Sequence, residues 1–400
     1  MLTLDKIYHA AYALKNVART TDLLRCKSLS NDANVYLKSE NLQITGSFKV
    51  RGAYYKISQL TEEQKQAGVI ACSAGNHAQG VALAASNNGI KAVVCMPDGA
   101  PISKVEATKG YGAEVVLVPG VYDDAYNKAL ELQKEKGYTF VHPFDDEDVI
   151  AGQGTIGLEI LDQLDNIDAV VVPIGGGGLI SGVAFAIKSL KPSIKVYGVQ
   201  AANAPSMYES VKQKKQITLD TVSTFADGIA VKHPGDLTFE IINKYVDEIV
   251  TVSEDEIAMA ILALMEKQKL VSEGAGATAV AAVVANKIPV KGKNVVCVVS
   301  GGNIDVNILS RVLTRGLSSS GRNVSMQIAL EDKPGQLVLV STVISKCGGN
   351  IINVRYERSD LNMPISSCYL TIGMETRDFA HIKLIEQKLT EAGLKIVKIM

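Results

Sequence analysis

One lysine of the chain stands in a segment suited to covalent chemistry. Lys49 lies in ENLQITGSFKVRGA (40–53), directly after Phe48 and just before an Arg-Gly pair. An amine forms a C=N bond with a carbonyl only when it is neutral, so a reactive lysine needs an apolar pocket. Phe48 could supply one wall of that pocket. Taken alone, the segment also fits an exposed helix lysine, because most lysines are exposed.

A second segment, CSAGNHAQG (72–80), follows the apolar run VIA and places Ser73, Gly75 and Asn76 where a strand turns into a helix. Free backbone N–H groups at a helix start, together with the helix dipole, suit a carboxylate or a phosphate. Plain N-capping by Ser73 or Asn76 explains the same residue types. The segment by itself therefore leaves anion binding and capping open.

Four consecutive glycines form a third segment, VVVPIGGGGLISG (170–182). They are Gly175, Gly176, Gly177 and Gly178. Because glycine has no Cβ, a loop of this kind brings its backbone N–H groups close to a phosphate. A structural turn rarely needs four glycines, so we predict a phosphate-binding loop.

Ser300 ends the strand-like run of a fourth segment, CVVSGGNID (297–305). A serine at the carboxyl end of a strand faces the crevice where open α/β sheets bind ligands, although a simple turn after a core strand competes. A further match, GQGTIG (152–157), has the G-x-G-x-x-G spacing of dinucleotide-binding loops. It follows the acidic FDDEDVI rather than a buried strand, so we do not expect a nicotinamide cofactor there.

The elements that must position these residues alternate between short apolar runs and longer helical patterns. The runs are continuously apolar, which is typical of strands buried on both faces. They occupy residues 69–73, 91–97, 113–119, 169–175, 195–200 and 294–300. The alternation predicts an α/β fold with a largely parallel sheet. Ser253 and Glu256 predict a capping box that opens a helix.

The composition changes near residue 315. The polar stretch RGLSSSGRN (315–323) lacks periodicity and predicts a linker at 316–324. Residues 325–400 then show the order βαββαβ, a ferredoxin-like arrangement. We therefore predict a first region at 1–315, with a small subdomain at about 45–150 inserted in a larger one, and a separate C-terminal unit.

Bulk properties exclude several classes of protein. The 41 basic and 42 acidic residues give a net charge of −1, so neither nucleic acid nor an anionic membrane is an expected partner. No apolar run approaches the roughly 20 residues of a membrane helix, and the N-terminus lacks the pattern of a signal peptide. The six cysteines are scattered and form no C-x-x-C pair, which favours a reducing cytoplasm.

The motifs SFKVRGA, SAGNHAQG, GGGGL, FADG, SEGAGA and SGGN together resemble the signatures of the threonine dehydratases, which are fold-type II enzymes dependent on pyridoxal 5′-phosphate (PLP). The resemblance covers about residues 5–315. It implies two open parallel-sheet subdomains, PLP bound covalently to Lys49, Phe48 near its ring, Asn76 on its ring hydroxyl and Ser300 facing its pyridine nitrogen. The implied phosphate loop is Gly175, Gly176, Gly177, Gly178 and Leu179. The implied site for the substrate carboxylate is Ser73, Ala74, Gly75, Asn76 and His77.

The reaction that the resemblance implies is a β-elimination of water. Lys49 removes the Cα proton of L-threonine while the cofactor accepts the negative charge, and the product hydrolyses to 2-oxobutanoate and ammonia. L-serine would give pyruvate by the same route. A hydroxyl at Ser300, in place of a carboxylate, leaves the pyridine nitrogen near neutral and favours elimination over reactions that need a long-lived carbanion.

Serine racemase, which resembles the chain over the same span and also eliminates water, is the alternative. That enzyme needs a serine at the position of Ala74, and alanine has no transferable proton. It also binds a divalent metal through acidic residues, where this chain has Gln200 and Ser206. Because a hard divalent cation prefers carboxylates, we expect no such metal site, while a monovalent cation remains open.

The C-terminal unit, about 325–400, resembles an ACT domain, a small module that binds amino acids, with EDKPGQL (331–337) as its first turn. The resemblance implies regulation by isoleucine, valine or another amino acid, with AMP as a nucleotide alternative and dimerisation alone as the competing role. It is compatible with amino-acid catabolism or isoleucine biosynthesis. We expect a homodimer or a homotetramer.

Overall fold

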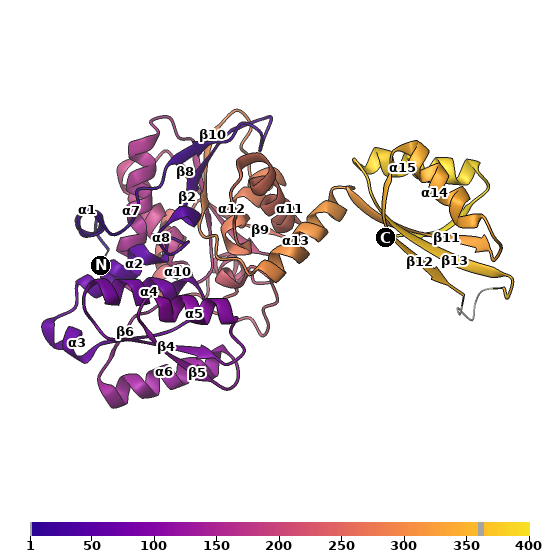
Figure 1. Ribbon diagram of the computed structural model, residues 1–400. Helices are drawn as coiled ribbons and strands as arrows, with labels where there is room; N and C mark the ends of the chain where they lie inside the picture. The colour runs from indigo at the N-terminus through magenta and orange to yellow at the C-terminus, as the bar shows by residue number, and fades with distance from the viewer. Residues whose placement is uncertain (1, 359–363) are drawn as a thin grey trace. The chain divides into compact units, whose positions relative to one another are not determined.

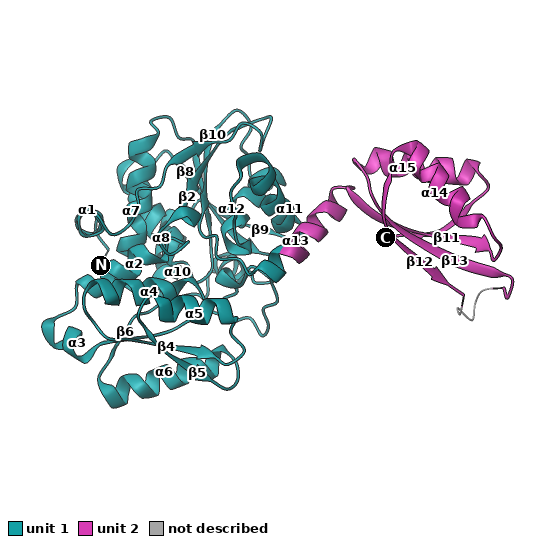
Figure 2. Cartoon of the chain, in the orientation of Figure 1, with its two compact units in different colours: residues 1–309 teal, residues 310–400 magenta. Residues whose placement is uncertain are grey.

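The computed structural model describes residues 2–358 and 364–400 and divides into two compact units, residues 1–309 and 310–400 (Figure 2). The boundary lies inside helix α13 (Val306–Ser319). The linker predicted at 316–324 is therefore wrong in part, because the helix continues to Ser319 and strand β11 already begins at Asn323. Gly316, the first residue of the predicted linker, is buried, whereas a free linker would leave it exposed.

Unit 1 contains a six-stranded sheet in the order β1-β2-β10-β7-β8-β9 (Figure 1). Adjacent strands of this sheet are parallel, except that β1 runs antiparallel to β2. The bounds are β1 (Leu23–Arg25), β2 (Asn34–Ser39), β7 (Ala169–Pro173), β8 (Lys195–Ala201), β9 (Glu248–Val252) and β10 (Asn294–Val299). Every residue of β7 is buried, as are all but the first of β8 and of β10, so the prediction from the continuous apolar runs is confirmed.

A second, four-stranded sheet of unit 1 is parallel throughout and has the order β5-β4-β3-β6. Its strands are β3 (Val69–Cys72), β4 (Ala92–Pro97), β5 (Glu114–Val118) and β6 (Thr139–Phe140). The α/β class with largely parallel sheets is thus confirmed. The apolar runs did not predict β1, β2, β6 or β9. These strands are short or carry polar residues, so no continuous apolar run marks them.

The helices of unit 1 connect these strands and cover both sheets. Their bounds are α1 (Leu4–Ala13), α2 (Lys49–Ser58), α3 (Glu62–Ala67), α4 (Asn76–Asn87), α5 (Ile102–Gly110), α6 (Tyr122–Lys136), α7 (Glu147–Gln163), α8 (Gly178–Leu190), α9 (Ser206–Gln213), α10 (Asp236–Tyr245), α11 (Glu254–Ala263) and α12 (Gly274–Val284). The predicted capping box of Ser253 and Glu256 is present at the start of α11. In the part of the chain that the structure describes, no helix has both the length and the apolarity to cross a bilayer.

The GQGTIG segment lies in the interior of α7, far from any strand-to-helix turn. Its glycines allow close helix contacts: a Cβ on Gly152 would lie 2.6 Å from the Cα of Gly52 on α2, and one on Gly154 would lie 3.0 Å from the carbonyl of Gly182 on α8. The segment therefore serves helix packing, and the expectation that it is not a dinucleotide loop agrees with its position.

Substituting Gly182 with alanine tests this contact. A Cβ at Gly182 would lie 2.5 Å from the backbone nitrogen of Gly154, so α7 and α8 must separate. We expect the free energy of unfolding to fall by about 1–3 kcal/mol, measured by urea denaturation. Gly110→Ala on α5 is the control, because a Cβ there has no atom within 4 Å. An equal loss in both variants would contradict the packing role.

Unit 2 is an antiparallel sheet with two helices, in the element order βαββαβ. Its strands have the spatial order β12-β13-β11-β14, in which all neighbours are antiparallel. The bounds are β11 (Asn323–Glu331), α14 (Gln336–Cys347), β12 (Asn350–Glu357), β13 (Ser367–Glu375), α15 (Phe379–Glu391) and β14 (Lys395–Ile399). The predicted ferredoxin-like arrangement is confirmed.

Candidate active site

Lys49 is the first residue of α2, and its side chain is partly buried. Its Nζ donates a hydrogen bond to the carbonyl of Pro143 at 2.6 Å and lies 5.3 Å from the centroid of the Phe48 ring. Burial lowers the pKa of the Lys49 amine to about 8, against an opposing effect of Glu273. From its sequence segment alone, Lys49 could be either a reactive lysine or an exposed helix residue. The structure gives it an environment that suits a reactive amine.

The Pro143 carbonyl is held in place by a turn built on His142. The Nδ1 atom of His142 accepts the backbone N–H groups of Phe144 and Asp145 at 3.3 and 2.7 Å. Burial lowers the pKa of His142, which keeps this nitrogen free to accept. No sequence pattern indicates that this turn lies beside Lys49, because the two segments meet only in the folded chain.

Phe48 connects the lysine segment to the end of β10. Its backbone N–H donates to the carbonyl of Ser300 at 3.1 Å, and Ser47 forms an isolated antiparallel bridge with Gly301. The Phe48 ring packs against the buried core of the large sheet. Ser300, which is only 3% exposed, is therefore held beside the segment that carries Lys49.

The 73–77 turn joins β3 to the start of α4. The backbone N–H of Gly75 donates to the Ser73 hydroxyl at 3.2 Å, and a Cβ at Gly75 would meet no atom within 4 Å. No side chain among the described residues caps α4, so its first N–H groups remain available to an anion. Ala74 lies in the middle of this turn, where the alternative enzyme would need a hydroxyl.

His77 is neutral at physiological pH. Burial, together with the nearby Lys49, lowers the pKa of its imidazole to about 3. Its Nε2 donates to the carbonyl of Val141 at 2.8 Å, the tautomer that a carbonyl acceptor requires. The ring therefore adds no positive charge for a carboxylate, and the backbone N–H is the group of His77 that suits an anion.

The glycine loop joins β7 to α8, and Gly177 has a positive φ of 100° that favours glycine. Neighbouring side chains of the protein leave no room for a Cβ at two positions of this loop. A Cβ on Gly176 would overlap the Phe144 ring, and one on Gly177 would lie 2.8 Å from Thr238. No described side chain caps α8, which begins at Gly178 and continues with Leu179. The loop thus ends in an uncapped helix start suited to a phosphate.

Glu273 and Asn303 also lie in this region, and the sequence alone assigned neither of them a role. The Asn76 amide donates to Glu273 at 2.6 Å and accepts from Asn303 at 2.8 Å. Both partners lie in motifs already noted, SEGAGA and SGGN, but a glutamate before a helix resembles an ordinary capping residue. Sequence separations of 197 and 227 residues hide the contacts.

A buried ion network behind Lys49 fixes α2. The guanidinium of Arg51 contacts Glu40 at 2.8 Å and Glu159 of α7 at 2.5 Å, and Lys38 of β2 contacts Glu159 at 2.6 Å. Arg51, Glu40 and Lys38 are at most 1% exposed. The network ties the helix that begins at Lys49 to the large sheet and to α7.

This arrangement combines an amine of lowered pKa with two uncapped helix starts, each of which suits an anion. A family model described as pyridoxal-phosphate dependent enzyme matches residues 14–301. The chain belongs to this family. The predicted PLP dependence is thereby confirmed. The matched segment contains Lys49, Asn76, the glycine loop and Ser300 of this PLP enzyme.

Three similar proteins extend the comparison. The L-threonine ammonia-lyase of Thermotoga maritima is 51% identical over 398 residues, which cover 99% of each chain. The structure of processed threonine deaminase isoform 2 from Solanum lycopersicum is 39% identical, covers 78% of this chain and 87% of that chain, and has a TM-score of 0.75. Maize serine racemase is 34% identical, covers 80% and 98% of the two chains, and also has a TM-score of 0.75.

The residues of this PLP enzyme fit the cofactor. Lys49 would bind its aldehyde carbon, the uncapped start of α8 with Gly175 to Leu179 would hold its phosphate, and Asn76 would face its ring hydroxyl. Among the described residues, no cluster of three or more His, Cys, Asp or Glu side chains could hold a metal ion.

Proposed function

We propose that the chain is a threonine ammonia-lyase, which converts L-threonine to 2-oxobutanoate and ammonia and L-serine to pyruvate and ammonia. The observation that carries the proposal is the environment of Lys49. Its amine has a lowered pKa, it is close enough to His77 of the β3–α4 turn to lower the pKa of that imidazole, and the adjacent Phe48 is bonded to Ser300 at the end of β10. The names and identities of the Thermotoga maritima and Solanum lycopersicum proteins support the choice of substrate.

Lys49 is the group that takes the Cα proton in this proposal. With a pKa of about 8, its amine has a larger neutral fraction near neutral pH than a lysine at its ordinary value of 10.5, and only the neutral form accepts a proton. The uncapped start of α4 would hold the substrate carboxylate and so orient Cα toward Nζ. Bound PLP supplies a conjugated ring that delocalises the negative charge at Cα. The β-hydroxyl gains a proton and leaves as water, and the proton that the Lys49 amine has taken from Cα balances this step.

Serine racemisation is the second candidate, because the maize racemase has a closely similar fold. Racemisation needs a second acid on the opposite face of Cα, and Ala74 offers none. Gln200 stands where the racemase binds a divalent metal through an acidic residue, and here its Oε1 accepts the backbone N–H of Tyr208 at 2.8 Å. These two positions favour elimination over racemisation.

Turnover of L-threonine and L-serine by the PLP-loaded protein tests the proposal. We expect 2-oxo acid release from both substrates, and chiral chromatography should find D-serine only as a minor product. D-serine as the main product would replace the lyase by the racemase. Cofactor binding without release of either product would reject both enzymes and leave an amino-acid sensor.

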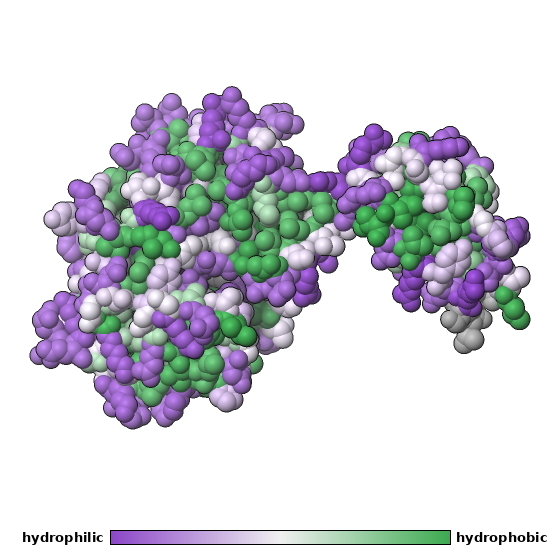
Figure 3. Space-filling model, viewed as in Figure 1, coloured by the Kyte–Doolittle hydropathy of each residue, from purple (hydrophilic) through white to green (hydrophobic). Residues whose placement is uncertain are grey.

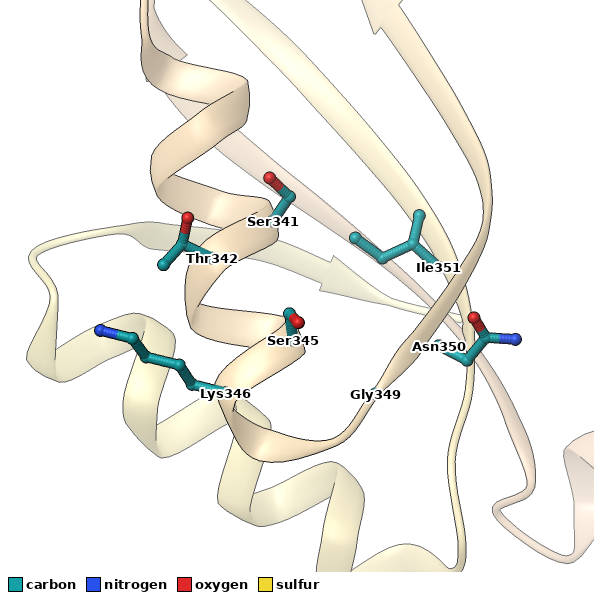
Figure 4. A pocket seen from close by; sticks show the side chains of 7 residues that line it. All are labelled: Ser341, Thr342, Ser345, Lys346, Gly349, Asn350 and Ile351. Carbon is teal, nitrogen blue, oxygen red and sulfur yellow. The ribbon is translucent and has the colours of Figure 1, made fainter.

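We propose that unit 2 is an ACT-like module that binds a small regulatory ligand. A surface hollow of about 520 Å³ lies between α14 and the start of β12 (Figure 4). It is lined by Ser341, Thr342, Ser345, Lys346, Gly349, Asn350 and Ile351. This polar lining supports an amino acid or a nucleotide as the ligand. Steady-state rates with and without isoleucine, valine and AMP test it, and three unchanged rates would leave dimerisation as the role of the unit.

We further propose a homodimer or homotetramer in a reducing cytoplasm. Apolar patches lie on the visible face of unit 2 in Figure 3, and Ile352, Val354 and Tyr356 are exposed on β12, a strand at the edge of its sheet. Such residues support association with another copy. The six cysteines are unpaired, which suits a reducing compartment. Light scattering after gel filtration measures the oligomeric state.

A further inference from the structure

Three sequence motifs that lie far apart in the chain meet at the side-chain amide of Asn76. On one side, the Nδ2 of Asn76 donates to the Oε1 of Glu273 at 2.6 Å. On the other side, its Oδ1 accepts from the Nδ2 of Asn303 at 2.8 Å. The amide is therefore held between a residue that precedes α12 and a residue of the loop after β10.

The orientation of the two amides follows from their partners. The Nδ2 of Asn303 also donates to the carbonyl of Thr45 at 2.7 Å. Because a carbonyl oxygen can only accept, both Nδ2 hydrogens of Asn303 are used. The Oδ1 of Asn76 must then face Asn303, and its Nδ2 must face Glu273. One of the two Nδ2 hydrogens binds Glu273, and within residues 2–358 and 364–400 the other has no acceptor.

Glu273 is placed for Asn76 rather than for its own helix. It precedes α12, but its side chain does not cap that helix, and the residue is only 4% exposed. The backbone of Gly301 makes room for it, because a Cβ there would overlap its Oε1. A buried carboxyl is costly unless it is well bonded, so a purely structural acid is a poor explanation for Glu273 at this position.

We propose that Glu273 and Asn303 are positioning residues, which fix the Asn76 amide from both sides so that its remaining N–H is directed at the ring hydroxyl of bound PLP. This inference rests on PLP binding and on the role proposed for Asn76. It assigns Glu273 and Asn303 a task in holding the cofactor that neither sequence motif discloses.

Glu273 also carries a charge that can change near neutral pH. Burial and the neighbouring Asp227 raise the pKa of its carboxyl to about 7, while Lys104, Asn76 and Lys49 oppose the rise. The absorption spectrum of bound PLP responds to a charge beside its ring hydroxyl. We therefore expect the spectrum of the PLP-loaded protein to change as Glu273 titrates, and this change to be absent in Glu273→Gln.

Equilibrium dialysis of the cofactor-free, full-length protein against PLP tests the positioning role. We expect Glu273→Ala and Asn303→Ala each to raise the Kd for PLP about tenfold, the effect of losing one hydrogen bond. Glu273→Gln keeps an acceptor and should recover most of the affinity. Glu254→Ala is the matched control, since Glu254 also stands at a helix start but binds the backbone of Phe225.

The Asn76→Ala background provides the decisive comparison. If Glu273 acts through Asn76, adding Glu273→Ala to Asn76→Ala should change the Kd less than twofold. The same tenfold loss in both backgrounds, or an equal loss in Glu273→Ala and Glu273→Gln, would overturn the inference. If Glu273→Ala does not fold, the inference is tested by the Kd of Asn303→Ala for PLP and by the pH dependence of the PLP spectrum in Glu273→Gln. Failure of the unsubstituted protein to bind PLP or turn over threonine would instead reject the proposed function.

Discussion

Replacing Lys49 with alanine is expected to lower the turnover of L-threonine by at least about 10³-fold, because it removes both the covalent attachment point and the proton acceptor. The bound cofactor should also lose its visible absorption band and become removable by gel filtration. In the unsubstituted protein, borohydride should reduce the attachment and make it permanent. Mass spectrometry of the reduced protein should then place the added mass on the peptide that contains Lys49.

Lys56→Ala is the matched control for this experiment. Lys56 lies on the same helix but is paired with Asp146 at 2.7 Å and Asp148 at 3.1 Å, so its loss should change turnover by less than about threefold. A Lys49→Ala protein that still holds PLP after borohydride treatment and retains turnover would show that another amine carries the cofactor.

Replacing Arg51 with alanine is expected to lower the free energy of unfolding by about 3–5 kcal/mol, which is the usual effect of removing one partner from a buried ion pair. Glu40, at 0% exposure, would then keep a buried charge without its cation, and Glu159 would lose its contact at 2.5 Å. Urea denaturation measures the loss. Turnover should also fall, because α2 carries Lys49 at its first position.

The free energy of unfolding at acid pH provides a second measurement of the Arg51 network. Burial alone would raise the pKa of Glu40, but Arg51 outweighs burial and holds that pKa below its ordinary value of 4.5. A lowered pKa in the folded protein contributes stability above pH 4.5, and that stability is lost as the pH falls toward the folded value. The difference between the unsubstituted protein and Arg51→Ala should therefore shrink in acid.

Lys65→Ala is the control for the Arg51 substitution. Lys65 forms an exposed pair with Glu62 at 2.7 Å, and the Glu62 side chain is 81% exposed. Exposed pairs of this kind contribute at most about 1 kcal/mol, so we expect little change in the urea midpoint. If Arg51→Ala were as mild as Lys65→Ala, the network would have no part in fixing α2.

The sequence predicted those parts of the fold that are encoded locally. The continuous apolar runs located β3, β7 and β10, and the residues that follow these strands lie where a parallel sheet places its ligand-binding loops. The capping box at Ser253 was also found, because both of its members lie within one helical turn. Patterns of this kind need only neighbouring residues.

The linker at 316–324 shows how local composition misleads. Its serines and glycines are typical of a flexible segment, yet α13 extends to Ser319. The burial of Gly316 supports the helix at the start of this segment, and burial depends on contacts that composition does not report. Tertiary packing outweighs helix propensity in such a segment.

The amino-acid sequence by itself determined the α/β class, the βαββαβ unit and the position of the glycine loop, because each is encoded in residues close together in the chain. It marked Lys49 as a candidate only, since the same segment also fits an exposed lysine. Only the tertiary structure decided the surroundings of Lys49 and of Asn76. Lys49 bonds the carbonyl of Pro143, and Asn76 bonds the carboxyl of Glu273 and the amide of Asn303, all of which come from distant segments. The pKa of a buried amine depends on the groups around it in space, so it is fixed only once the chain has folded.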